Sequence, residues 1–143
     1  MTCAPATPMP KVLIIDDAPF IADIYRRFLV KQGFTVEVDL DGQDALAQIA
    51  TSQPDAVLLD IMLKNASGLE ILQKIRAKQE LQHLPVIILS SATSLSLFRK
   101  LKEAGATRLF NKVSSKPAEV VEAIRFACSS KSQVVEVPVA AVP

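Results

Sequence analysis

Cysteine, histidine and tryptophan are scarce or missing in this chain of 143 residues, which has two Cys, one His and no Trp. A typical structural zinc site, which needs four Cys or His ligands, is therefore excluded. Cys3 and Cys128 lie near opposite ends of the chain. This placement favours two reduced thiols in a cytoplasmic protein, although a disulfide between them is left open.

Long hydrophobic runs and an excess of charge of one sign are also absent. The apolar runs have the length of strands, well below the roughly 20 residues that a helix needs to cross a bilayer. The first ten residues, MTCAPATPMP, lack the basic start and apolar core of a signal peptide. Because 16 Lys and Arg face 15 Asp and Glu, for a net charge of +1, we expect neither direct nucleic-acid binding nor membrane binding.

Half of the residues are hydrophobic, which is typical of a globular domain. Short apolar runs at 11–15, 35–38, 56–59, 86–89 and 107–111 predict strands, and they alternate with segments of helical periodicity. The first helix is predicted from Pro19, in its first turn, to a cap at Gly33. The others are predicted at 43–50, 69–78, 95–104 and 117–127, with Ser114 or Ser115 capping the last.

This alternation predicts an α/β fold with a doubly wound, five-stranded parallel sheet and five helices. The strand order 2-1-3-4-5 is expected, and in that order the functional site lies where strands 1 and 3 end. The domain is predicted to span residues 11–128. Residues 1–10 and 129–143 are predicted to be an N-terminal tail and a C-terminal tail or linker.

Three carboxylates follow directly after predicted buried strands. Asp16 and Asp17 end the first strand, and Asp60 ends the third. The expected strand order brings these three acids to one edge of the sheet, where they repel one another unless a cation neutralises them. Oxygen ligands without a nearby thiol or imidazole suit Mg²⁺. The sequence therefore predicts a magnesium site at this edge.

A hydroxyl and an ammonium complete the same edge of the predicted sheet. Ser90 ends the fourth strand, and Lys112 follows the fifth. A metal ion and a lysine neutralise phosphate charge, a hydroxyl donates to a phosphate oxygen, and a carboxylate can act as nucleophile. The combination indicates a site for a phosphoryl group.

These motifs, taken in order, resemble the receiver domain of two-component response regulators, which has a flavodoxin-like fold. The resemblance covers about residues 11–128. It rests on the motifs VLIIDD, Asp41-Gly42 before Ala45-Leu46, PDAVLLDIM, Gly68-Leu69-Glu70, PVIILSSA and GATRLFNK.

The resemblance assigns the acids separate roles. Asp60 is similar to the phosphoacceptor, which takes a phosphoryl group from a histidine kinase or a phosphotransfer protein. Asp17 is similar to the carboxylate that binds Mg²⁺ directly, and Asp16 to the one that binds it mainly through water. The backbone carbonyl of Met62 is implied as a further metal ligand.

The resemblance also implies a switch. Ser90 is similar to the hydroxyl that moves toward the phosphoryl group, and Lys112 to the lysine that pairs with it. The surface formed by helix 95–104, strand 107–111 and helix 117–127 would then bind a downstream protein or an output domain. A homodimer through this surface is left open. No enzyme in the turnover sense is expected, only slow hydrolysis of the chain's own acyl phosphate.

Three positions depart from the family pattern. Lys64 stands where proline is usual, Leu109 where an aromatic switch residue is common, and Val113 where proline follows the lysine behind a cis bond. A cis bond before a non-proline residue costs about 3 kcal/mol, so we expect a trans Lys112–Val113 bond and a reshaped loop. Phe110 should face away from Leu109. These departures favour the alternative, a degenerate receiver that binds partners without phosphorylation, whereas the complete set of acids, hydroxyl and lysine argues against it.

Overall fold

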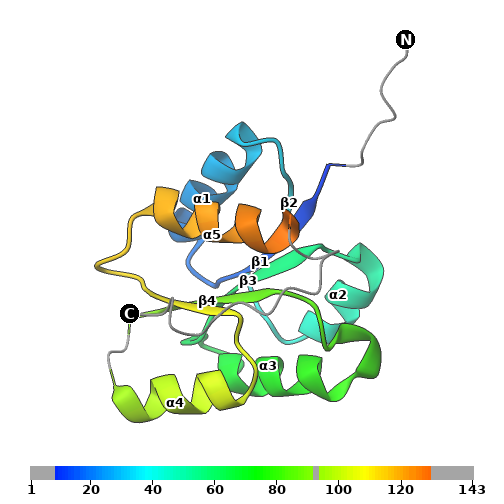
Figure 1. Ribbon diagram of the computed structural model, residues 1–143, viewed down its shortest axis with the longest axis vertical. Coiled ribbons are helices and arrows are strands. Elements are labelled where there is room, and N and C mark those ends of the chain that lie inside the picture. Colours follow the sequence, from blue (N-terminus) through cyan, green and yellow to red (C-terminus); the bar gives the residue numbers. More distant parts are fainter. Residues whose placement is uncertain (1–8, 92–93, 130–143) are drawn as a thin grey trace.

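The computed structural model describes residues 9–91 and 94–129 (Figure 1). Strands and helices alternate along the chain, with one short 3₁₀ helix, η1, before the fourth strand. In order they are β1 (Lys11–Ile15), α1 (Pro19–Lys31), β2 (Thr35–Asp39), α2 (Ala45–Ser52), β3 (Ala56–Asp60), α3 (Gly68–Ala77), η1 (Gln79–Leu81), β4 (Val86–Ser90), α4 (Leu95–Glu103), β5 (Arg108–Asn111) and α5 (Pro117–Ser129).

The strands form a parallel sheet in the order β2-β1-β3-β4-β5. This confirms the predicted fold class and strand order. β3 and β4 are buried at every residue, because helices cover both sheet faces, and this explains why their sequences are continuously apolar rather than alternating. The register pairs Asp60, the last residue of β3, with Leu89 of β4.

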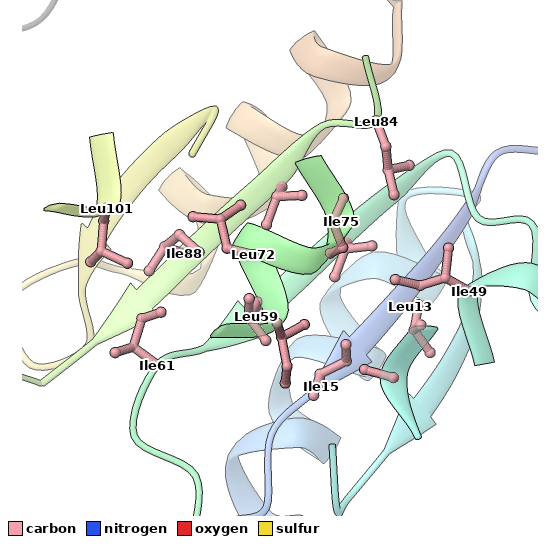
Figure 2. Packing of buried hydrophobic residues seen from close by; sticks show 14 residues of the cluster. Leu13, Ile15, Ile49, Leu59, Ile61, Leu72, Ile75, Leu84, Ile88 and Leu101 are labelled. Atoms are coloured by element: carbon pink, nitrogen blue, oxygen red, sulfur yellow. The ribbon is translucent and has the colours of Figure 1, made fainter. Parts of the chain in front are cut away.

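Two apolar cores lie on the two faces of the sheet. α1 and α5 cover one face, and α2, α3 and α4 cover the other (Figure 1). Successive strand residues alternate between the cores, so that Leu13 and Ile15 of β1 face α2 and α3, whereas Val12 and Ile14 face α1 and α5. Figure 2 shows the core beneath α2, α3 and α4, in which Leu72 and Ile75 of α3 pack across the strands.

Two glycines end helices in the same way. Gly33 after α1 and Gly105 after α4 have φ values of 96° and 105°. After α1, the N–H of Gly33 donates to the Val30 carbonyl and that of Phe34 to the Leu29 carbonyl, each at 3.0 Å. This is the hydrogen-bond pattern of a Schellman cap, and it requires a left-handed residue at the glycine. The predicted cap of the first helix is thus confirmed.

The helix boundaries show where side-chain periodicity is a weak guide. α2 begins at Ala45, two residues later than predicted, and the helix η1 was not predicted. The prediction that Ser114 or Ser115 caps the last helix is wrong, because α5 begins at Pro117 and Lys116 occupies the capping position. The Glu119 carboxylate accepts a hydrogen bond from the Lys116 N–H at 3.0 Å, which is half of a capping box.

Among the described residues, no helix combines the length and the apolar character that crossing a bilayer demands. Cys3 and residues 130–143 of the predicted C-terminal tail lie outside these residues, whereas Ser129 is the last residue of α5.

Replacing Gly33 by Ala should lower the free energy of unfolding by about 1 kcal/mol, the cost of placing a β-carbon in the left-handed region. Within 4 Å, the added β-carbon would contact only the Met9 side chain, at 4.0 Å. Any loss of stability would therefore come from the backbone conformation and not from a steric clash. Gly33→Asn should lose less, since Asn tolerates this conformation better. Urea unfolding of the three proteins checks this, and equal losses for Ala and Asn would contradict it.

Candidate phosphoryl-transfer site

The carboxyl ends of β1 and β3 bring three acids together. Asp16 and Asp17 follow β1 directly, and Asp60 ends β3. One oxygen from each carboxylate lies within 4.8 Å of the others. Asp16 and Asp60 are 2% and 3% exposed, and Asp17 is partly exposed. The structure therefore brings together the three acids that the sequence analysis singled out, two of them beneath the surface and one at its rim.

Lys112 bridges the two buried carboxylates. Its Nζ lies 3.0 Å from Asp60 Oδ2 and 3.3 Å from Asp16 Oδ2. The lysine follows β5, and its side chain is 19% exposed. A single ammonium thus neutralises part of the charge of two carboxylates that burial and mutual repulsion would otherwise make costly.

Burial and the contact between these groups shift the pKa values of Asp16 and Lys112. Burial raises the pKa of Asp16. The hydrogen bond from the Ala18 N–H and the charge of Lys112 oppose the rise, and the charge of Asp60 adds to it. Burial by itself would lower the pKa of Lys112, but the hydrogen bond that its ammonium donates to Asp60 and the charges of both acids raise it. The lysine is therefore held charged beside a carboxylate that would gain from a further cation.

The backbone after β3 fixes the Asp60 carboxylate. The Met62 N–H donates to Asp60 Oδ1 at 3.1 Å, while Oδ2 accepts from Lys112. Met62 and Ser67 form an antiparallel bridge, and its hydrogen bond runs from the Gly68 N–H to the Ile61 carbonyl at 3.2 Å. This hydrogen bond does not involve the Met62 carbonyl, which is the predicted metal ligand. Met62 contacts the Asp60 carboxylate through its N–H.

Gly68 was part of a quoted motif, but its role could not be read from the sequence. It is the first residue of α3, and a β-carbon there would lie 2.6 Å from Ile61 Cα and 2.7 Å from the Asp60 carbonyl oxygen. The start of α3 therefore packs directly on the backbone that carries Asp60. Only glycine permits this approach without displacing one of the two segments.

Ser90 ends β4, the strand beside β3, and is 1% exposed. Its carbonyl accepts a hydrogen bond from the Lys112 N–H at 2.8 Å. The structure thus places Ser90 and Lys112 at the same sheet edge as the acids, as predicted, and connects the two residues through the main chain.

Two hydrogen bonds connect the loop between β3 and α3 to neighbouring loops. The Lys64 N–H donates to Asp17 Oδ2 at 2.6 Å. The Asn65 side chain donates to Asp41 Oδ1 at 3.3 Å. The sequence analysis missed both contacts. A proline at position 64 has no N–H and would exclude the hydrogen bond to Asp17. The non-proline residue at this position was therefore the only sequence feature that could have indicated this contact.

The loop after β5 is shaped by an asparagine. No cis peptide bond occurs within residues 9–91 and 94–129, so the bond before Val113 is trans, as expected. The Asn111 side-chain oxygen accepts hydrogen bonds from the Val113 and Ser114 N–H groups, at 2.8 and 3.0 Å. Val113 is 83% exposed. The loop after β5 is therefore closed by an Asx turn at Asn111.

Leu109 and Phe110 face opposite sides of the sheet, as predicted. Leu109 packs against the core beneath α3 and α4, and Phe110 against the core beneath α1 and α5. The guanidinium carbon of Arg108 lies 5.0 Å from the centre of the Phe110 ring, within the range of a cation–π contact. No aromatic side chain therefore occupies position 109 or reaches its side of the sheet from position 110.

The donor chemistry of the site suits a hard divalent cation. Its candidate ligands are the carboxylate oxygens of three aspartates and the carbonyl of Met62. Mg²⁺ prefers such oxygen ligands and retains several waters. The partly exposed Asp17 at the rim leaves a side open to solvent for those waters.

Comparison with known proteins gives a consistent result. Residues 12–125 match the family model for the response regulator receiver domain. Response regulator MprA of Mycolicibacterium vanbaalenii and that of Mycobacterium ulcerans are each 36% identical over 86 residues, which are 60% of this chain and 36% of each relative. The match thus spans little more than a third of these curated relatives.

Solved structures also resemble the chain. The BeF3-activated N-terminal receiver domain of Klebsiella pneumoniae RstA superposes with a TM-score of 0.75 and 28% identity, covering 82% of this chain and 97% of that one. A CheY-like receiver domain protein from Methanospirillum hungatei gives a TM-score of 0.81 and 25% identity, covering 88% and 98%.

Gly68→Ala should destabilise the protein by about 1–3 kcal/mol, because the new β-carbon overlaps the backbone of Asp60 and Ile61. Helix propensity alone predicts the opposite sign. Thermal unfolding and the amide NMR shifts of residues 60–62 provide the measurement. Gln73→Ala, at an exposed position of α3, is the control and should change stability by less than about 0.5 kcal/mol. A stabilised Gly68→Ala protein with unmoved shifts would contradict the packing argument.

Proposed function

The chain belongs to the response regulator receiver family of two-component signalling, and on that premise we propose that it is a phosphorylation switch whose phosphoacceptor is Asp60. The phosphodonor would be the phosphohistidine of a histidine kinase or of a phosphotransfer protein. The observation that carries the proposal is the fixed Asp60 carboxylate, held between the Met62 N–H and the Lys112 ammonium.

Asp60 is the acid that the resemblance to receiver domains assigns as nucleophile, and it makes the shorter of the two carboxylate contacts with Lys112. Both of its oxygens have donors that orient the carboxylate, and the strand beneath it is buried throughout. An Asp60 oxygen would form a bond to phosphorus while the bond between phosphorus and the donor imidazole nitrogen breaks. The electron pair of that bond remains on the imidazole, and Asp60 becomes an acyl phosphate.

Charge neutralisation is the main task of the surrounding groups. Lys112 already contacts Asp60 Oδ2 at 3.0 Å, so it can pair with phosphoryl oxygens that appear beside that atom. Receiver domains generally bind Mg²⁺ at an acidic pocket. Here Asp16, Asp17, Asp60 and the Met62 carbonyl would hold the ion, which would supply positive charge to the transferring phosphoryl group.

The output would pass through Ser90 and Lys112. Because the Lys112 N–H is bonded to the Ser90 carbonyl, movement of either residue toward a phosphoryl group displaces the ends of both β4 and β5. α4 follows β4 after a short connection and buries only Leu101 completely, so it can shift at small cost. We place the partner surface on α4, β5 and α5, where Leu95 and Phe126 are 73% and 56% exposed.

The occupant of that surface would be a downstream protein, an output domain or a second copy of the chain. The chain would act in the cytoplasm and would not turn over substrate, since its acyl phosphate would hydrolyse slowly in the same pocket. The alternative, a receiver that binds partners without phosphorylation, has less support, because the pocket retains the nucleophile, the acids and the lysine in contact.

Acetyl phosphate with Mg²⁺ should add one phosphoryl group to the wild-type protein and none to Asp60→Asn, as measured by intact-protein mass spectrometry. The amide lacks the negative charge of the nucleophile but keeps its shape. Asp44→Asn changes an exposed acid outside the pocket and should be labelled normally. Chelation of Mg²⁺ should suppress labelling of the wild type. Labelling of Asp60→Asn, or equal labelling without Mg²⁺, would contradict the proposal.

Ser90→Ala should accept the phosphoryl group but fail to transmit the change. In the wild type, phosphorylation should shift the amide NMR signals of Leu97 and Leu101 in α4. These shifts should fall by more than half in Ser90→Ala. Ser91→Ala removes an exposed hydroxyl next to it and should behave as the wild type. Unchanged α4 shifts in Ser90→Ala would exclude Ser90 as the switch residue.

A further inference from the structure

The main-chain N–H of Lys64 lies 2.6 Å from Asp17 Oδ2, so that the loop between β3 and α3 is bonded to an acid of the pocket. We propose that Lys64 is a positioning residue for cation binding, acting through this N–H and not through its side chain. The inference rests on the proposed function in one respect, namely that Asp17 is a metal ligand.

The donor is held in place independently of Asp17. On its N-terminal side, Met62 donates to Asp60. On its C-terminal side, Gly68 donates to the Ile61 carbonyl, and the adjacent Ser67 caps α3 by accepting from the Glu70 N–H at 3.3 Å. The short loop between these points has little freedom, so its N–H can direct the Asp17 carboxylate.

The acceptor needs such a partner. Asp17 is only partly buried and lies in the connection between β1 and α1, so packing confines its side chain less than that of Asp16, which is 2% exposed. Asp16 accepts from the Ala18 N–H at 2.9 Å and pairs with Lys112. The N–H of Lys64 fixes one oxygen of Asp17 and leaves the other available to a cation.

The residue type at position 64 decides whether this bond exists. Proline, usual at this position in the receiver pattern, has no main-chain N–H and cannot donate. Every other residue can, and the Lys64 side chain is exposed. Lys64, a departure from the family pattern that by itself favours a degenerate receiver, therefore adds a hydrogen bond to one of the proposed metal ligands.

Hydrogen bonds to metal ligands commonly affect affinity, and their removal weakens metal binding by about 10–100-fold. The Lys64 bond should therefore raise the affinity for Mg²⁺ by holding Asp17 in its ligating orientation. It also couples the two loops, because the cation and the loop between β3 and α3 share one carboxylate.

The test is a Mg²⁺ titration of the full chain, followed by the amide NMR shifts of Ala18 and Met62, with no phosphodonor present. Lys64→Pro should weaken Mg²⁺ binding about tenfold. Lys64→Ala keeps the N–H and should bind within about twofold of the wild type. To separate loss of the N–H from the effect of the proline ring, Lys64 is also replaced by its α-hydroxy acid, which keeps the side chain and should weaken binding like proline.

The outcomes distinguish this inference from the proposed function. Wild-type affinity in both the proline and the ester proteins would overturn the positioning role, and so would an equal loss in Lys64→Ala. Asp17→Asn is titrated in parallel and should lose most of its Mg²⁺ affinity. If Asp17→Asn binds like the wild type, the proposed metal site itself fails. Unfolding midpoints without Mg²⁺ identify any variant whose loss reflects poor folding.

Discussion

Two buried carboxylates share one ammonium at the end of the sheet, and the remaining architecture depends on this arrangement. Asp16 and Asp60 are almost fully buried, and Lys112 contacts both. Buried charges of one sign are tolerated only with compensation, and one lysine does not fully compensate two acids. Burial is the main cause of the raised pKa of Asp16, and the charge of Asp60 raises it further while Lys112 lowers it. This imbalance of charge is the physical basis for the proposal that the pocket binds a cation and then accepts an anionic phosphoryl group.

The sheet supplies the positions, and the backbone supplies the orientation. Parallel strands place Asp60 and Ser90 at the ends of the adjacent strands β3 and β4, with Lys112 following β5. Main-chain N–H groups then act on the site directly, Met62 on Asp60 and Lys112 on the Ser90 carbonyl. Lys112 contacts Asp60, the proposed phosphoacceptor, with its side chain and the Ser90 carbonyl of β4 with its backbone. A change of charge at Asp60 would therefore act on both β4 and β5.

The sheet and the acids could be predicted from the sequence because both follow from side-chain patterns. Continuous apolar runs identify buried parallel strands, and acids directly after such runs must lie at the sheet edge. The loops could not be predicted in the same way. Contacts such as Lys64 N–H to Asp17, or the close approach of Gly68 to Asp60, depend on where the main chain points. The error at the start of α5 has the same origin, since Glu119 reaches back to the backbone of Lys116.

The two missing prolines bear on whether the site is degenerate. Lys64 and Val113 lie in the loops that follow β3 and β5, and each supplies an N–H that proline lacks. The Lys64 N–H bonds to Asp17 and the Val113 N–H to the Asn111 side chain. In a degenerate receiver, we would expect main-chain N–H groups of this kind to be hydrogen-bonded only to solvent, and the charged residues of the pocket to have lost their mutual contacts. Here both N–H groups have protein acceptors, and Lys112 contacts both buried acids. The two substitutions therefore replace proline by hydrogen bonds that stabilise the loops around the pocket.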